Sequence, residues 1–203
     1  MHQFGRVLGR SFNENYQNSP YFHWPKAISD TIVDEFIRVG ESLATMEAKT
    51  GNGFDSSAVH PQIRTSTLSW IKYNDETKLL YELLIRRIDS VNFWHYGFAL
   101  DAMDSIQYTR YPVGGHYKFH NDVLKKKEDH MRKLSVVVGL SSPSDYEGGE
   151  LEIAPAGGTS VHKFRLDRGD LIAFPSWTPH RVAPVTSGHR ITAVVWVLGP
   201  KFV

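Results

Sequence analysis

The 203-residue sequence contains no cysteine, which excludes disulfide bonds, thiolate metal ligands and a cysteine nucleophile. Any metal site must therefore use histidine nitrogens and carboxylate oxygens. Long apolar runs are also missing. None approaches the roughly 20 residues of a membrane-spanning helix, and the opening segment MHQFGRVLGR lacks the apolar core of a signal peptide. We therefore expect a soluble, cytoplasmic protein with no membrane partner.

The sequence also has no excess of charge of one sign. Its 23 Lys and Arg residues nearly balance 22 Asp and Glu residues, giving a formal net charge of +1. Such a chain has no broad basic field to attract nucleic acid, so we expect a discrete site and no nucleic-acid partner. The length and the 41% hydrophobic content are sufficient for one buried core. We expect residues 1–203 to form a single domain.

The first half of the chain is predicted to be rich in helix. Residues 27–49 place apolar side chains at spacings of three and four, and residues 75–94 repeat this pattern. Between them, residues 64–73 alternate well enough for an outer strand. We therefore expect residues 1–100 to form a helix-rich part that packs on a sheet.

The second half, residues 101–203, changes to short β-branched and aromatic runs separated by Gly and Pro. Eight such runs are predicted to be strands: 105–111, 116–122, 133–140, 150–154, 161–166, 170–175, 180–185 and 190–198. Short strands with regular turn signals are typical of an antiparallel jelly roll or barrel. The expected fold class is thus mainly β with flanking α-helices and a jelly-roll core that carries the site.

The segment YPVGGHYKFHND, residues 111–122, contains two histidines and an aspartate that suggest a metal site. In a helix, His116 and His120 would share a face as in zinc proteases, but Tyr117 occupies the place of their catalytic Glu and two glycines precede the pair. In a strand, His120 and Asp122 point to the same side and can share one metal. We expect His116, next to the glycine bend, to lie outside the metal site.

His180 is the candidate third ligand, because it begins a short strand after an apolar, buried one. Two histidines and one carboxylate form a facial triad that suits non-haem Fe(II) and leaves three positions open. Arg190 opens the following strand, where alternation places Thr192, Val194 and Trp196 on the same face. The guanidinium can pair with a carboxylate in the cavity, and Thr192 can add a hydroxyl.

These motifs together resemble a known family. The pattern Tyr111-x-x-Gly114-x-x-Tyr117-x-x-His120-x-Asp122, then DYEGGEL at 145–151, then His180 with Arg190, is similar to the Fe(II)/2-oxoglutarate-dependent dioxygenases of the prolyl 4-hydroxylase type. It most resembles the PKHD-type hydroxylase subgroup, which has close counterparts of HRVAPVTSGHR. The resemblance covers about half of the chain, from Ser105 to Gly199.

The resemblance implies a double-stranded β-helix whose catalytic Fe(II) is held by His120, Asp122 and His180. It further implies that Arg190 binds the far carboxylate of 2-oxoglutarate, that Tyr111 lines the co-substrate pocket and that O2 is the oxidant. Family members often carry Tyr where this sequence has Gly139. A pocket partner is therefore expected to be missing, or replaced by Thr192.

The same resemblance narrows the reaction. Related halogenases have a small residue in place of Asp122, and nucleic-acid demethylases of the AlkB type carry a second Arg in place of Trp196. We therefore expect hydroxylation of an amino-acid side chain, with a prolyl residue in a peptide or protein favoured by family analogy. Two alternatives stay open: a free amino acid or small metabolite as substrate, and a cupin-like metal-binding module without oxygenase activity. The oligomeric state is not indicated.

The substrate side of the site is predicted from position alone. Tyr117 and Trp177 lie near metal ligands in the sequence and are candidate substrate-facing aromatics. The segment VLKKKEDHMRK, residues 123–133, is highly charged and follows the strand that carries the ligand pair. We predict that it forms a mobile loop at the mouth of the active site.

Overall fold

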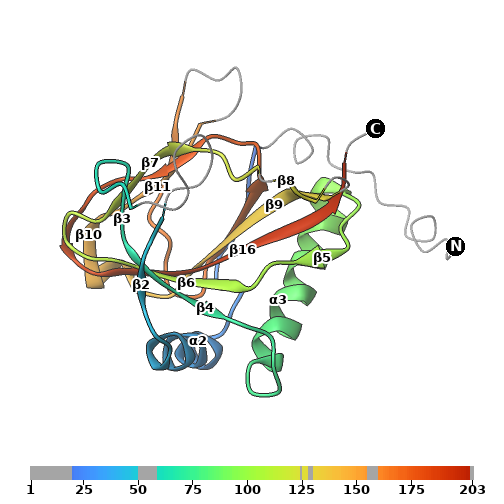
Figure 1. The fold of residues 1–203 in the computed structure, drawn as a ribbon, viewed down its shortest axis with the longest axis horizontal. Helices are drawn as coiled ribbons and strands as arrows, with labels where there is room; N and C mark the ends of the chain where they lie inside the picture. The colour runs from blue at the N-terminus through green and yellow to red at the C-terminus, as the bar shows by residue number, and fades with distance from the viewer. Residues whose placement is uncertain (1–19, 50–58, 124, 128–129, 155–159, 202–203) are drawn as a thin grey trace, which may run out of the picture.

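The computed structural model describes residues 20–49, 59–123, 125–127, 130–154 and 160–201. In these residues two antiparallel sheets face each other, and two helices cover one of them (Figure 1). No helix in the described ranges is long and apolar enough to cross a membrane.

The larger sheet has nine strands. Seven follow the order β1-β13-β9-β16-β6-β4-β2, while β5 pairs with β16 and β8 pairs with β9. Their bounds are β1 Phe22–Trp24, β2 Met46–Glu47, β4 Thr67–Ile71, β5 Ala102–Met103, β6 Ile106–Tyr111, β8 Lys125–Lys127, β9 His130–Gly139, β13 Leu171–Pro175 and β16 Arg190–Pro200. The long strand β16 lies in the middle of this sheet (Figure 1).

The smaller sheet has five strands in the order β12-β11-β14-β7-β3. Their bounds are β3 Arg64–Thr65, β7 His116–His120, β11 Leu151–Ile153, β12 His162–Phe164 and β14 His180–Val182. A separate pair joins β10 (Tyr146–Gly148) to β15 (Val185–Gly188). All eight strands predicted in the second half are present. Four of them (β6, β9, β13, β16) belong to the larger sheet and four (β7, β11, β12, β14) to the smaller, as expected for a jelly roll.

The helices α2 (Asp30–Ser42) and α3 (Lys78–Val91) lie on the outer face of the larger sheet (Figure 1). Phe36 and Leu84 from the helices are fully buried against strand residues such as Val136 and Val195. A short π-helical turn, Asn92–Tyr96, follows α3. The apolar side chains buried between the two helices and the larger sheet form the main core of the protein. This core holds the larger sheet in place.

Two predictions for the first half were partly wrong. The helix expected over residues 27–49 is only α2, because Leu43 is extended and residues 46–47 pair with β4 as a strand. Sheet pairing here overrides a helical pattern. The outer strand expected over residues 64–73 divides into β3 in the smaller sheet and β4 in the larger. Because β4 lies between β6 and β2, it is not an edge strand.

The loop predicted over residues 123–133 is also largely a strand pair. Residues 125–127 form β8, which pairs with β9, and β9 already begins at His130. Residues 124 and 128–129 lie outside the described residues. The sequence KKKEDHMRK is charged but alternates too little to indicate a hairpin, so pattern alone favoured a loop.

Alternation along the central strands sorts side chains between the two faces of the larger sheet. Val136 and Val138 of β9 point to the helices, whereas Ser135 and Val137 point toward the smaller sheet. On β16 the inward-facing side chains are Arg190, Thr192, Val194 and Trp196, as predicted. They line a cavity of about 250 Å³ between the sheets.

Candidate active site

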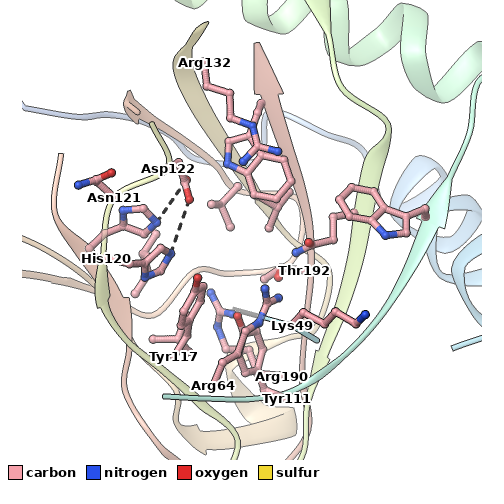
Figure 2. Close-up of a pocket in the computed structure, with 18 residues that line it drawn as sticks. Lys49, Arg64, Tyr111, Tyr117, His120, Asn121, Asp122, Arg132, Arg190 and Thr192 are labelled. Carbon is pink, nitrogen blue, oxygen red and sulfur yellow. Dashed lines mark ion pairs between the residues drawn. The ribbon is translucent and has the colours of Figure 1, made fainter. Parts of the chain in front are cut away.

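The three predicted metal ligands meet at one end of the cavity. His120 on β7 and His180 on β14 are partners in the strand register, and their ring centroids lie 4.2 Å apart. Asp122 follows β7, and its backbone N–H donates to the Ser176 carbonyl at 2.8 Å. Its carboxylate lies 3.6 Å from Nε2 of His120 and 3.4 Å from Nε2 of His180 (Figure 2). One donor atom from each residue lies within 4.8 Å of the others.

The local backbone orients both imidazole rings. Nδ1 of His120 lies 2.8 Å from the Lys118 carbonyl, and Nδ1 of His180 lies 2.9 Å from the Thr178 carbonyl. A carbonyl can only accept, so the proton on each ring is assigned to Nδ1. Each Nε2 therefore presents a lone pair to the shared centre, which is the arrangement that a histidine ligand requires.

Burial and neighbouring groups shift the pKa of two of the ligands, His120 and Asp122. Burial lowers the pKa of His120 to about 3. Burial alone would raise the pKa of Asp122, but the adjacent His180 and His120 outweigh it and hold this pKa below its ordinary value. Ser135 on β9 also donates to Asp122 Oδ2 at 2.7 Å. The site thus offers two imidazole nitrogens and one carboxylate oxygen.

Arg190 lies in the same cavity and is only 3% exposed. It stands opposite Tyr111 of β6 in the register, with Cζ 5.3 Å from the tyrosine ring centroid. No acidic side chain in the described part of the chain forms an ion pair with it. The buried hydroxyl of Thr192, on the same face of β16, likewise has no hydrogen-bond partner among the described residues. A buried guanidinium beside an unsatisfied hydroxyl is a site for a carboxylate.

The structure therefore brings His120, Asp122, His180, Tyr111, Arg190 and Thr192 into one cavity. The donor set of two nitrogens and one oxygen fits Fe(II). Arg190, which has no acidic partner in the described ranges, and Thr192 fit the far carboxylate of a dicarboxylic acid that binds the metal at its other end. The residues present thus fit both groups that the sequence motifs imply.

The missing tyrosine at Gly139 does not leave an empty space. Gly139 faces Thr192 in the register, and a Cβ atom placed on it would lie 2.5 Å from the Asp167 carbonyl oxygen. The backbone of Asp167 and the side chain of Leu166 therefore occupy the place of a side chain at residue 139. Tyr146 on β10 lies beside Arg190: burial raises the pKa of this phenol, and Arg190 opposes the rise. The DYEGGEL motif contains this tyrosine, but its spacing gave no sign that it reaches Arg190.

The remaining predicted residues have different placements. Tyr117 lines the cavity and stacks on His120 with ring centroids 3.5 Å apart. Trp177 is 41% exposed, packs on Phe98 at 5.5 Å and is not a lining residue of this cavity. His116 lies outside the His–Asp–His cluster, as expected. The structure thus supports a cavity position for Tyr117 and gives no such support for Trp177.

Several lining residues were not predicted from the sequence: Lys49, Arg64, Trp70, Gln107, Asn121 and Arg132. Arg64 and Trp70 come from β3 and β4 in the first half of the chain. The alternation in RTSTLSWIKY predicted one strand. It could not show that the segment divides into two strands that belong to different sheets. The cavity is therefore more basic than its metal ligands alone suggest (Figure 2).

Comparison with known families agrees with this geometry. A family model described as the 2OG-Fe(II) oxygenase superfamily matches residues 106–198. A PKHD-type hydroxylase of Nitrobacter winogradskyi is 31% identical over 180 residues, which are 84% of this chain and 76% of that protein. One from Stenotrophomonas maltophilia is 41% identical over 95 residues, which are 45% of this chain and 41% of that protein. For several PKHD-type hydroxylases, the region that aligns with this chain is only about two fifths of their own length.

Solved structures show the same fold at lower identity. A Pseudomonas putida prolyl-4-hydroxylase superposes with a TM-score of 0.70 at 19% identity, covering 92% of this chain and 96% of that one. A prolyl hydroxylase from Trichoplax adhaerens gives 0.72 at 19% identity, covering 91% and 86%. The fold is therefore a double-stranded β-helix of the 2OG-Fe(II) oxygenase kind. Given the Nitrobacter match in particular, this chain belongs to the 2OG-Fe(II) oxygenases, among the PKHD-type hydroxylases.

Proposed function

We propose that this protein hydroxylates an amino-acid side chain, with a prolyl residue of a peptide or protein as the favoured target. Family membership supports the reaction type and disfavours the cupin-like alternative. The Trichoplax prolyl hydroxylase of the same fold is in complex with a peptide fragment, which supports a peptide substrate by analogy. The observation that carries the proposal is the convergence in one cavity of the His–Asp–His cluster with Arg190, which has no acidic partner among the described residues, and with Thr192.

Each residue has a distinct role in this proposal. His120, Asp122 and His180 hold Fe(II), and Arg190 with Thr192 binds the far carboxylate of 2-oxoglutarate. Iron, 2-oxoglutarate and O2 together supply the oxidation: one oxygen atom enters the substrate C–H bond, the other enters succinate, and CO2 is released. The protein positions these groups and excludes water through the two sheet walls.

The reaction type is tested with Fe(II)-loaded protein. Without O2, addition of 2-oxoglutarate should produce a weak charge-transfer absorption band, and with O2 and a substrate it should release succinate. A screen of proline-containing peptides and free amino acids then distinguishes the substrate classes. Stimulation by nucleic acid alone would contradict the proposal.

The ligand assignment is tested separately by metal binding. Replacement of His180 by Ala should abolish tight Fe(II) binding, because only two of the three protein ligands would remain. Replacement of His116 by Ala is the matched control and should leave binding unchanged. The reverse pattern, measured by titration calorimetry, would show that the assignment is wrong.

A further inference from the structure

A second buried arginine, Arg64, faces the cavity from the side opposite the larger sheet. It is 7% exposed and lies on β3, where it pairs with Tyr117 of β7 in the register. Its Cζ lies 4.7 Å from the Tyr117 ring centroid, and Tyr117 in turn stacks on His120. Arg64, Tyr117 and His120 thus form a column that ends at the metal cluster (Figure 2).

Arg64 has no anionic partner among the residues that the structure describes. Its Nε donates to the Ser66 hydroxyl at 2.9 Å, and no carboxylate within the described ranges pairs with its terminal nitrogens. A guanidinium does not lose its proton in a protein, so its burial requires compensation from a negative charge. Arg132 in the same cavity differs, because Asp104 pairs with it at 3.0 Å.

The anions already assigned to the cavity do not serve Arg64. Asp122 is held by Ser135 and the two histidines on the far side of Tyr117. The far carboxylate of 2-oxoglutarate is assigned to Arg190, and its other end to the metal. Lys49, exposed at the cavity, adds a further positive charge. A binding position for one more anion, next to the metal ligands, therefore remains.

We propose that Arg64 binds a carboxylate group of the substrate, so that the enzyme selects an acidic substrate. This inference rests on the proposed function and specifies its substrate class. The carboxylate is either the main-chain carboxylate of a free or C-terminal amino acid, or an acidic side chain next to the target residue. A planar guanidinium matches a carboxylate with two parallel hydrogen bonds, and stacking on Tyr117 fixes its plane.

The test measures binding without turnover. Mn(II) replaces Fe(II), 2-oxoglutarate is saturating, and calorimetry compares N-acetyl-proline with N-acetyl-prolinamide, which differ only in the carboxylate. A second pair of capped peptides, with Pro-Asp or Pro-Asn at the centre, examines the side-chain source. We expect at least one acid to bind about tenfold or more tightly than its amide, because a charge-assisted pair is lost.

Variants of Arg64 connect this preference to the residue. Arg64→Met should reduce binding of the acid to the level of its amide while leaving 2-oxoglutarate affinity within about threefold of the parent, a change of under about 1 kcal/mol. Arg64→Lys keeps a charge without the planar fork and should lose only part of the preference, which covers the case that the Met variant does not fold. Arg38→Met, on the exposed face of α2, should change neither affinity.

Three results would overturn the proposal. One is equal binding of acid and amide in both pairs, or binding of none of them. Another is an Arg64→Met protein that loses 2-oxoglutarate affinity as Arg190→Met is expected to, which would assign Arg64 to the co-substrate. Failure of the parent protein to bind 2-oxoglutarate at all would overturn the proposed function together with this inference.

Discussion

Arg190 differs from most surface arginines in that its charge is buried and lacks an acidic partner within the described chain. If it anchors 2-oxoglutarate, Arg190→Met should leave metal binding nearly unchanged and weaken 2-oxoglutarate affinity about 10² to 10⁴-fold. This follows because removing one partner of a buried charge pair costs roughly 3 to 5 kcal/mol. Calorimetry with Mn(II)-loaded protein measures both affinities. An affinity within about fivefold of the parent would contradict the assignment.

Ser135 is the residue that supports Asp122 from the larger sheet. Groups that hydrogen-bond a metal ligand typically account for about 10 to 100-fold in metal affinity. We therefore expect Ser135→Ala to weaken Mn(II) binding within this range without unfolding the protein. Ser90→Ala, a hydroxyl on the exposed side of α3, provides a control that should not change the affinity. An unaltered affinity in Ser135→Ala would mean that this hydrogen bond does not orient the carboxylate.

The metal ligands could be predicted from the sequence because the spacing of residues along a strand determines which side chains point to the same side. The H-x-D pair needs only the alternation of one strand, and Arg190 and Thr192 share a face for the same reason. Ser135 and Arg64 were not predictable, because each reaches the cavity through pairing between distant strands. Tyr146 belongs to the DYEGGEL motif, but its approach to Arg190 depends on the separate β10–β15 pair.

At the scale of elements, Gly139 shows how tightly β9 packs against the turn before β13. A methyl group at this position would meet the Asp167 carbonyl oxygen at 2.5 Å. We expect Gly139→Ala to destabilise the fold by about 1 to 3 kcal/mol, the usual cost of overpacking. Urea unfolding measures the difference, and Thr186→Ala on the exposed part of β15 should change stability by no more than about 0.5 kcal/mol. A neutral Gly139→Ala would show that the turn moves freely.

The elements of the second half were predicted better than those of the first. Most of the predicted strands there have Gly or Pro at or next to one end, and these residues are strong local signals. The helix predicted to residue 49 ends at Ser42, because residues 46–47 find a partner in β4 that the local pattern does not reveal. Likewise, the pairing of β8 with β9 depends on β9 extending beyond its apolar stretch.

At the scale of the whole molecule, acid stability should depend on Glu152 of the smaller sheet. Arg181 donates to this buried carboxylate at 2.7 Å and holds its pKa below the ordinary 4.5. Its stabilising contribution is therefore complete above pH 4.5 and is lost as the pH falls through the lower folded pKa. Glu152→Gln should unfold more easily at neutral pH, with a gap to the parent that narrows in acid.

Thermal unfolding between pH 3 and 7 measures this gap. The control is Glu35→Gln, whose pKa is lowered by Arg38 in an exposed pair on α2 and which should change stability little. A gap that stays constant with pH would show that Glu152 contributes through packing rather than charge.

The single domain predicted for residues 1–203 is tested by cooperativity. One buried cluster joins α2 and α3 to β9 and β16, so helices and sheet should unfold together. We expect helical circular dichroism and tryptophan fluorescence to report the same denaturant midpoint. Loss of helix at a lower denaturant concentration would indicate an independent N-terminal unit.

The position of β16 has a consequence for synthesis on the ribosome. This strand follows every other one in the described chain, yet it lies at the centre of the larger sheet between β9 and β6. Until β16 has been synthesised, the edges of β6 and β9 that later pair with it therefore have unpaired backbone N–H and C=O groups. Such exposed strand edges promote aggregation. Because Arg190 and Thr192 arrive with the same strand, a half-made chain lacks the proposed co-substrate anchor, and we expect oxidation to begin only after the sheet is complete.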